Sequence, residues 1–313
     1  MNVFITGAAG GLGRALAGEC ASRGYNVFLT DINEEGLNRL KRGLERQFGA
    51  AVAAKYCDLT DPRSFDALLA HIDAHGLLFD MVLNVAGCDF EGAFTERERE
   101  KLVQIVLLNN AAALRVTHAL LRRRRPGRRF AIVFVSSLAS MFPMPLKATY
   151  AASKRFLLDL AMALRQELKA EGVSVLAVCP AGLATTDETL SSIRAQGFMG
   201  DVTTASLEDV ARRTIDLALA GKNLYIPGLA GRLLSSSGKS PRALSPRRWS
   251  TGGGAAPTSL GRKKSGAENA ASQLFFFPCG GDTTRRHRAG GLKTREKRRN
   301  GSAGALSAPN WIK

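Results

Sequence analysis

The feature that most constrains the fold is a glycine-rich turn between a short apolar strand and a helix at the start of the chain. Residues 2–6 predict a strand, Gly7-Ala-Ala-Gly-Gly-Leu-Gly13 follows at once, and residues 11–23 carry apolar side chains at helical spacing. Such a turn lets backbone N–H groups and the helix N-terminus approach a pyrophosphate, although glycines alone would also fit an ordinary turn. The predicted cofactor contacts here are Gly7, Gly11, Leu12 and Gly13.

A carboxylate ends the second predicted strand. Asp31 closes residues 26–31 and stands 18 residues after Gly13. An acid at this place suits the ribose hydroxyls of NAD and repels the extra phosphate of NADP. None of the seven residues after Asp31 is basic, and position 10 is glycine rather than arginine, so we favour NAD over NADP. The alternative is that Asp31 is a turn or cap residue of the next helix.

Tyr150 and Lys154 predict a proton-transfer site. They stand four residues apart on a predicted helix and therefore share one face of it. The ammonium favours the phenolate and should lower the pKa of Tyr150. Ser137, at the end of the strand that starts at Phe130, would offer its hydroxyl to a substrate oxygen. A lone Tyr-x-x-x-Lys is more often a solvated helix face, but this combination favours interconversion of an alcohol and a carbonyl.

Taken together, these motifs resemble the classical short-chain dehydrogenase/reductase (SDR) family over about residues 1–235. Thr6–Gly13, Ser137, Tyr150 and Lys154 carry the resemblance, and Asn84-Val-Ala-Gly87 is similar to the family's Asn-Asn-Ala-Gly element. Pro180-Ala181 is similar to the family's Pro-Gly element, with Ala181 in place of the glycine. The resemblance also implies further cofactor contacts. They are Asp58, Leu59, Asn84, Ala86, Gly87, Tyr150, Lys154, Pro180 and Thr185.

The resemblance also implies a mechanism. Tyr150 would act as general acid or base, and Lys154 would hold the nicotinamide ribose. Ser137 would orient the substrate oxygen, and Asn109 would support a water-linked proton path to Lys154. The expected activity is NAD(P)-dependent interconversion of a secondary alcohol and a ketone or aldehyde, with a small, neutral or lipophilic substrate. The alternative is an NAD(H)-binding sensor or scaffold with little catalysis.

Alternating elements predict an α/β fold. Strands are expected near 2–6, 26–31, 51–57, 80–85, 130–136, 173–179 and 223–226, and helices at 11–23, 34–48, 62–75, 95–123, 149–171 and 206–220. This order predicts a Rossmann-type, doubly wound, mostly parallel seven-stranded sheet with helices on both faces. By the resemblance, helices 95–123 and 149–171 would pack against their copies in a homodimer or homotetramer.

The chain divides in composition near residue 235. Of its 44 Lys and Arg and 27 Asp and Glu, 17 bases but only 3 acids follow residue 230. We expect residues 1–235 to form the catalytic domain and the basic, Gly- and Ser-rich residues 236–313 to form a disordered tail. A shifted reading frame or read-through would explain the tail, unselected disorder is the next alternative, and nucleic-acid binding is not expected.

Other sequence features exclude some classes of protein. The arginines of residues 122–129 follow a predicted helix, where cations complement the helix dipole, which favours a structural role. The five cysteines show neither disulfide nor metal-ligand spacing, so no metal is expected. The chain begins with a strand and has no apolar run long enough for a membrane span, so we expect a cytoplasmic location and no membrane partner.

Overall fold

The computed structural model of the protein describes residues 1–181 and 206–228. The predicted cofactor contact Thr185 and the predicted tail at 236–313 lie outside the described residues. The predicted domain 1–235 is described except at 182–205 and after 228.

The described residues form the expected α/β architecture around one seven-stranded sheet, in the order β3-β2-β1-β4-β5-β6-β7. Every pairing in it is parallel. The strands are β1 Asn2–Thr6, β2 Asn26–Asp31, β3 Val52–Tyr56, β4 Met81–Asn84, β5 Phe130–Val135, β6 Val173–Val178 and β7 Leu224–Tyr225.

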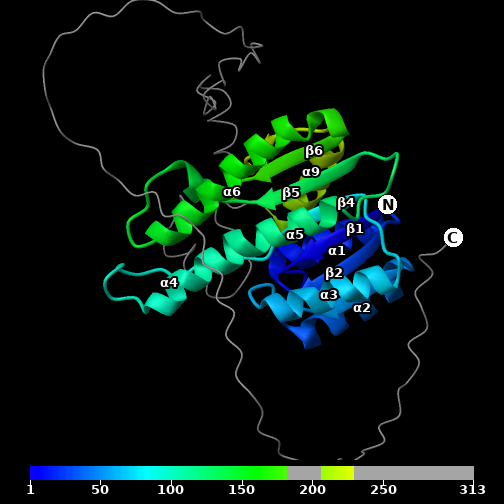
Figure 1. Cartoon of the computed structure of the whole chain (residues 1–313), viewed down its shortest axis with the longest axis horizontal. Helices are drawn as coiled ribbons and strands as arrows, with labels where there is room; N and C mark the ends of the chain where they lie inside the picture. Colours follow the sequence, from blue (N-terminus) through cyan, green and yellow to red (C-terminus); the bar gives the residue numbers. More distant parts are fainter. Residues whose placement is uncertain (182–205, 229–313) are drawn as a thin grey trace, which may run out of the picture. The chain divides into compact units, whose positions relative to one another are not determined.

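Helices cover both faces of this sheet (Figure 1). Helices α1, α2 and α9 pack on one face, and α3, α5 and α6 pack on the other. The helices are α1 Gly11–Ser22, α2 Glu34–Phe48, α3 Pro62–Ala74, α4 Arg99–Val106, η1 Leu107–Ala111, α5 Ala112–Leu121, η2 Leu138–Met141, α6 Ala148–Glu167, η3 Lys169–Glu171 and α9 Leu207–Leu219.

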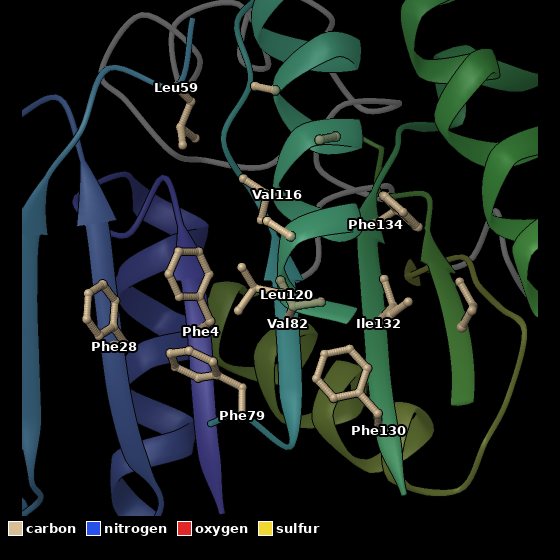
Figure 2. Packing of buried hydrophobic residues seen from close by; sticks show 14 of the residues in the cluster. Phe4, Phe28, Leu59, Phe79, Val82, Val116, Leu120, Phe130, Ile132 and Phe134 are labelled. Carbon is tan, nitrogen blue, oxygen red and sulfur yellow. The ribbon is translucent and has the colours of Figure 1, made fainter. Parts of the chain in front are cut away.

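Each strand contributes to two hydrophobic cores because successive side chains point to opposite faces. In β1, Phe4 packs on the side of α3, α5 and α6, whereas Val3 and Ile5 pack on the side of α1 and α9. Figure 2 shows the first of these cores, where the rings of Phe4 and Phe28 stack with centroids 5.3 Å apart. Burial on both faces explains why the strands are nearly continuous hydrophobic runs.

The long helix expected over 95–123 differs from the prediction in two ways. It begins only at Arg99, because residues 94–96 form a turn and Arg97 and Glu98 are not helical, and a π-helical segment, η1, separates α4 from α5. Asn109 and Asn110 are consecutive residues of η1, and both are buried. The helix expected over 149–171 ends at Glu167 and continues as the short 3-10 helix η3.

Three of the six arginines in residues 122–129 form ion pairs. Arg123 pairs with Asp73 at 2.6 Å, Arg124 with Glu171 at 2.8 Å and Arg125 with Asp80 at 3.6 Å. These pairs hold the loop after α5 at the end of the sheet where the strands begin. An open cavity of about 1010 Å³ lies there, lined by Arg122, Arg128 and other loop residues. It is remote from the residues that the sequence assigns to chemistry.

The described residues contain neither a membrane-spanning helix nor a cluster of metal ligands. Within 1–181 and 206–228, no helix is long and apolar enough to cross a bilayer. Among the same residues, no three His, Cys, Asp or Glu side chains gather as metal ligands would. Cys20, Cys57 and Cys179 are buried free thiols, and Cys88 is half-buried.

Candidate active site

The predicted site residues gather at the carboxyl ends of the strands. Gly7 follows β1, Asp31 ends β2 and Asn84 ends β4, while Ser137 and Pro180 follow β5 and β6. Strands β1 and β4 are neighbours in the sheet, although β2 and β3 lie between them in the chain. The order of the strands therefore reverses between β1 and β4, which is where ligands bind in open parallel sheets.

The glycine turn is packed so closely that a side chain would not fit at Gly7 or Gly13. Gly7 has a φ of +63°, and a Cβ there would lie 2.8 Å from the Ala86 backbone of the neighbouring turn. A Cβ on Gly13 would overlap the Gly7 carbonyl oxygen. Helix α1 begins at Gly11, and its N-cap residue Gly10 offers no side-chain acceptor to the first-turn N–H groups. These donors can therefore bind a pyrophosphate, as the sequence predicts.

Asp31 is fixed against this turn. Its Oδ2 accepts a hydrogen bond from Ala9 N at 2.9 Å, and its Oδ1 accepts one from Asn33 N at 2.9 Å. The carboxylate thus stands next to the dinucleotide turn, but part of its hydrogen-bonding capacity is used by the backbone. It serves both as a turn residue and as a candidate ribose partner.

A cavity of about 310 Å³ beside Asp31 contains two arginines that the sequence argument missed. Ala9, Asn33, Arg14 and Arg39 are among its lining residues. Arg39 stands one position beyond the window of seven residues considered after Asp31, and its side chain binds Glu35 at 2.9 Å. Helical spacing could have revealed it, because Arg39 stands three residues after Gly36, which also lines the cavity, and residues three apart are neighbours on a helix surface.

The remaining predicted cofactor residues are anchored at two further strand ends. Asp58 follows β3, and its Oδ1 accepts hydrogen bonds from the amide and hydroxyl of Thr60, while Leu59 is buried in the core. The Asn84 amide donates to Thr117 Oγ1 at 3.0 Å. The Asn84 Oδ1 is buried with no hydrogen-bond partner among the described residues, which leaves a free acceptor at the switch point.

Ser137 and Pro180 lie side by side across β5 and β6. The Ser137 Oγ accepts from Ala139 N at 3.1 Å and points toward the Pro180 carbonyl oxygen, 3.5 Å away. The preceding residue, Ser136, donates to the Lys154 carbonyl oxygen at 2.7 Å. This bond fastens α6 to the end of β5, so that the helix and the serine keep a fixed relation.

Lys154 is a buried ammonium group. Its side chain donates to the Val135 carbonyl oxygen at 3.0 Å, and only 5% of the residue is exposed. Burial lowers the pKa of Lys154 from 10.5 to about 8. Its Nζ lies 5.6 Å from the centre of the Tyr150 ring. The structure thus brings the two predicted catalytic side chains together.

The expected lowering of the Tyr150 pKa by Lys154 is not observed in this arrangement. Burial raises the pKa of Tyr150 above its ordinary value, and the Ser137 hydroxyl and the Lys147 charge partly oppose this rise. The Lys154 ammonium points to the Val135 carbonyl, whereas Lys147 is among the groups that lower the pKa of the phenol. The spacing of Tyr150 and Lys154 predicts the effect of the cation, but it contains no measure of desolvation.

Asn109 fastens the turn after β4 to α6. Its Oδ1 accepts from Cys88 N at 2.8 Å, and its Nδ2 donates to Cys88 O at 3.0 Å and to Ser153 Oγ at 2.9 Å. Gly87 packs directly on this group, because a Cβ there would lie 3.0 Å from Asn109 Oδ1 and 3.2 Å from Lys154 Nζ. Burial raises the pKa of the neighbouring Cys88 thiol, which favours a packing role over a nucleophilic one.

An ion pair that was not predicted from the sequence lies beside Tyr150. Lys147 binds Asp89 at 2.6 Å and Glu91 at 3.0 Å, and its Nζ lies 5.9 Å from the centre of the Tyr150 ring. Lys147 and Asp89 are 58 residues apart in the chain, so no local sequence pattern predicts their contact.

Comparison with known proteins agrees with this geometry. The family model described as short chain dehydrogenase matches residues 1–196. The chain belongs to the short-chain dehydrogenase family. Its Rossmann-like sheet and its glycine turn are therefore those of an SDR protein.

Two curated relatives illustrate the range of similarity. The chain is 31% identical over 179 residues to a very-long-chain 3-oxoacyl-CoA reductase of Pyrenophora tritici-repentis, covering 56% of this chain and 52% of the relative. It thus spans about half the length of that relative. It is 28% identical over 236 residues to the 3-oxoacyl-(acyl-carrier-protein) reductase FabG of Escherichia coli, covering 72% of this chain and 95% of the relative.

Solved structures show the same fold. A short-chain dehydrogenase from Sphingobium yanoikuyae, in complex with NADPH, has a TM-score of 0.65 at 27% identity, covering 80% of this chain and 98% of that one. A 3-oxoacyl-(acyl-carrier protein) reductase from Brucella melitensis, with bound NAD, has a TM-score of 0.63 at 27% identity, covering 72% and 88%. The L-sorbose reductase of Gluconobacter frateurii shares the fold at 22% identity, with a TM-score of 0.66 and coverage of 72% and 94%.

Proposed function

We propose that the protein is an NAD(P)-dependent oxidoreductase that interconverts a secondary alcohol and a ketone or aldehyde. The observation that carries the proposal is the close grouping of Tyr150, Lys154, Ser137 and Asn109 beside a dinucleotide turn. A protein that only binds the cofactor does not need a buried lysine next to a half-buried tyrosine. That buried ammonium costs free energy, which argues for a chemical role.

The residues present fit a dinucleotide. Gly7 and Gly13 leave no room for a Cβ, the first-turn amides of α1 offer donors for the pyrophosphate, and Asp31 stands ready for the adenosine ribose. When bound, the nicotinamide supplies or takes up the hydride. Tyr150 then donates or accepts the proton at the substrate oxygen, and Ser137 holds that oxygen in place.

Two side chains would support this proton transfer. Lys154 would hold the nicotinamide ribose and, once its ammonium turns from the Val135 carbonyl, favour the phenolate of Tyr150. Asn109, which is fully buried, would keep the turn after β4 in register with α6 and support a proton path to Lys154.

We infer that NAD is the preferred cofactor, since the Asp31 carboxylate would repel a ribose phosphate. The cavity that contains Arg14 and Arg39 supports the rival choice, because two guanidinium groups could bind that phosphate. Of the two solved relatives with a cofactor named above, one binds NADPH and the other NAD. The ratio of wild-type kcat/KM values for NAD and NADP distinguishes the two choices.

The proposal extends to substrate and assembly. Two of the curated relatives act on 3-oxoacyl thioesters, so a 3-oxoacyl thioester is the first substrate to test.

We further propose a homodimer or homotetramer in the cytoplasm. Apolar side chains are exposed along α4, η1, α5 and α6, which would suit a second copy of the chain. They are Val103, Val106, Leu107, Leu114 and Phe156.

The test compares Tyr150→Phe with the control Tyr56→Phe, which changes an exposed tyrosine of β3. Tyr150→Phe should retain NADH binding, measured by fluorescence, and lose about 10²- to 10⁴-fold in kcat because only the proton-transfer hydroxyl is removed. The control should keep kcat. Near-wild-type turnover by Tyr150→Phe would show that another group moves the proton. NADH binding by the wild type without turnover of any carbonyl tested would favour a sensor or scaffold instead.

A further inference from the structure

The segment after β4 and the segment that leads into α6 are joined at several points beside Tyr150. Gly92 N donates to the Leu146 carbonyl oxygen at 2.8 Å, and Lys147 binds Asp89 and Glu91. Leu146 has a φ of +65°, the one non-glycine residue with a positive φ in the part of the chain that the structure describes. A branched side chain adopts this conformation only where the surroundings impose it.

The Asp89 carboxylate is half-buried and incompletely satisfied. Its Oδ2 accepts from Lys147, whereas its Oδ1 is buried and accepts no hydrogen bond among the described residues. An unpartnered buried carboxylate oxygen lowers stability and calls for a functional explanation. The preceding residue, Cys88, is held by Asn109 through two hydrogen bonds, so Asp89 is placed by the same group that places the turn after β4.

Lys147 is positioned to act on the phenol of Tyr150. It is the N-cap residue of α6 and its carbonyl accepts from Ala151 N at 2.8 Å, so its backbone is part of the first helical turn. Tyr150 follows three residues later, which puts the two side chains on one face of the helix. Burial acts to lower the pKa of Lys147, but Asp89 and Glu91 outweigh it, raise the pKa and keep Lys147 a cation, whereas burial lowers the pKa of Lys154.

We propose that the Asp89–Lys147 ion pair is a positioning pair that ties the two segments together and sets the acid strength of Tyr150 by opposed charges. This inference rests on the proposed function, in which Tyr150 moves the proton. Lys147 stabilises the phenolate, Asp89 destabilises it, and their tie keeps both at fixed distances from the ring. The charged or polar groups that face Tyr150 are Ser137 after β5, Cys88 and Asp89 after β4, and Lys147 and Lys154 around the start of α6.

The two members of the pair predict shifts of opposite sign. Lys147→Gln removes the cation and should raise the apparent pKa of Tyr150. Asp89→Asn removes the anion while Glu91 still holds Lys147, and should lower it. For a charge 5.9 Å from the centre of the Tyr150 ring, as Lys147 Nζ is, the shift should amount to about 0.5 to 2. If the pair only fastened the loops, neither charge would act on the phenol, and the two substitutions would not shift the pKa of Tyr150 in opposite directions.

The experiment titrates Tyr150 directly, without a substrate. The near-ultraviolet absorbance of the phenolate is followed against pH for each variant, and the curve of the same variant carrying Tyr150→Phe is subtracted. Lys147→Arg keeps the charge and should keep the wild-type titration. Arg155→Gln, which breaks the exposed Arg155–Asp159 pair on the same helix, is the matched control and should also leave it unchanged.

The pH dependence of kcat/KM is then measured with a 3-oxoacyl thioester of N-acetylcysteamine as the probe. Shifts of opposite sign in the phenolate titrations of the two variants support the proposal. Shifts of the same two signs in the pH dependence of kcat/KM support it further. Shifts of the same sign, or none beyond those of Arg155→Gln, overturn it. Opposed phenolate shifts in a protein without turnover would leave the pair intact and refute the proposed oxidoreductase function instead.

Discussion

Replacing Lys154 by methionine should abolish turnover at every pH. Its effect on the free energy of unfolding should instead depend on pH. Methionine has a similar length and is apolar, so it fills the same space without an ammonium group. The wild-type residue is 5% exposed and donates one hydrogen bond, to the Val135 carbonyl. Without added cofactor, the folded protein therefore holds a poorly solvated charge that the unfolded chain exposes to water.

The pKa of Lys154 gives the sign and the size of the effect. It falls from 10.5 in the unfolded chain to about 8 in the folded protein. Below about pH 8 the lysine is protonated in both states, and above it the folded protein releases a proton that the unfolded chain retains. Unfolding then takes up a proton, so the free energy of unfolding rises with pH. The full gain is about 3 kcal/mol, of which about 2 kcal/mol is present at about pH 9.5.

Urea denaturation at about pH 7 and about pH 9.5 measures this gain as the difference between wild type and Lys154→Met. Taking the difference cancels titrations that the two proteins share. The wild type should gain about 2 kcal/mol relative to the variant over this interval, while Lys154→Met lacks turnover at both values. Lys169→Met, which changes an exposed lysine, is the control and should follow the wild type. An equal pH dependence of wild type and Lys154→Met would refute the argument from burial.

Three further predictions follow from the site and the helices. Asp31→Ala with Ile32→Arg should raise the ratio of kcat/KM for NADP over NAD by about tenfold or more, and a wild type that already prefers NADP would contradict our assignment. Asn109→Ala leaves the Cys88 amide and carbonyl without partners and should lower the free energy of unfolding in urea by about 2–4 kcal/mol; a loss below about 1 kcal/mol would show that water replaces the amide. In sedimentation, the wild type should form dimers or tetramers at micromolar concentration and Leu114→Glu should shift it toward monomer, whereas a purely monomeric wild type would remove the expected assembly.

The order of the elements could be predicted from the sequence because it depends on local patterns. The strands read as apolar runs, since both faces of a parallel sheet are covered, and the glycine turn marks where β1 passes into α1. The residues at the strand ends follow from the same topology, which places Gly7, Asn84 and Ser137 at one edge. Their grouping needed no knowledge of distances.

What depends on burial or on long-range contact could not be predicted. The pKa of Tyr150 is dominated by desolvation, and the sequence gives no measure of that. The Asp89–Lys147 contact joins residues from separate loops, and Arg39 enters the region near Asp31 through the geometry of α2. The family resemblance supplied roles for Asn109 and Pro180 that neither charge nor periodicity indicates.

The π-helical turn η1 has a consequence for insertions and deletions. A π turn holds more residues than an α turn, and here it sits between two regular helices, α4 and α5. Removing one residue from 107–111 would let the backbone close into ordinary α-helix, but α4 would then rotate by about 100° relative to α5. Asn109 would lose its place opposite Cys88, even though every other side chain is retained. The segment is thus constrained in length as well as in side chain, a constraint that a scan of single substitutions would not detect.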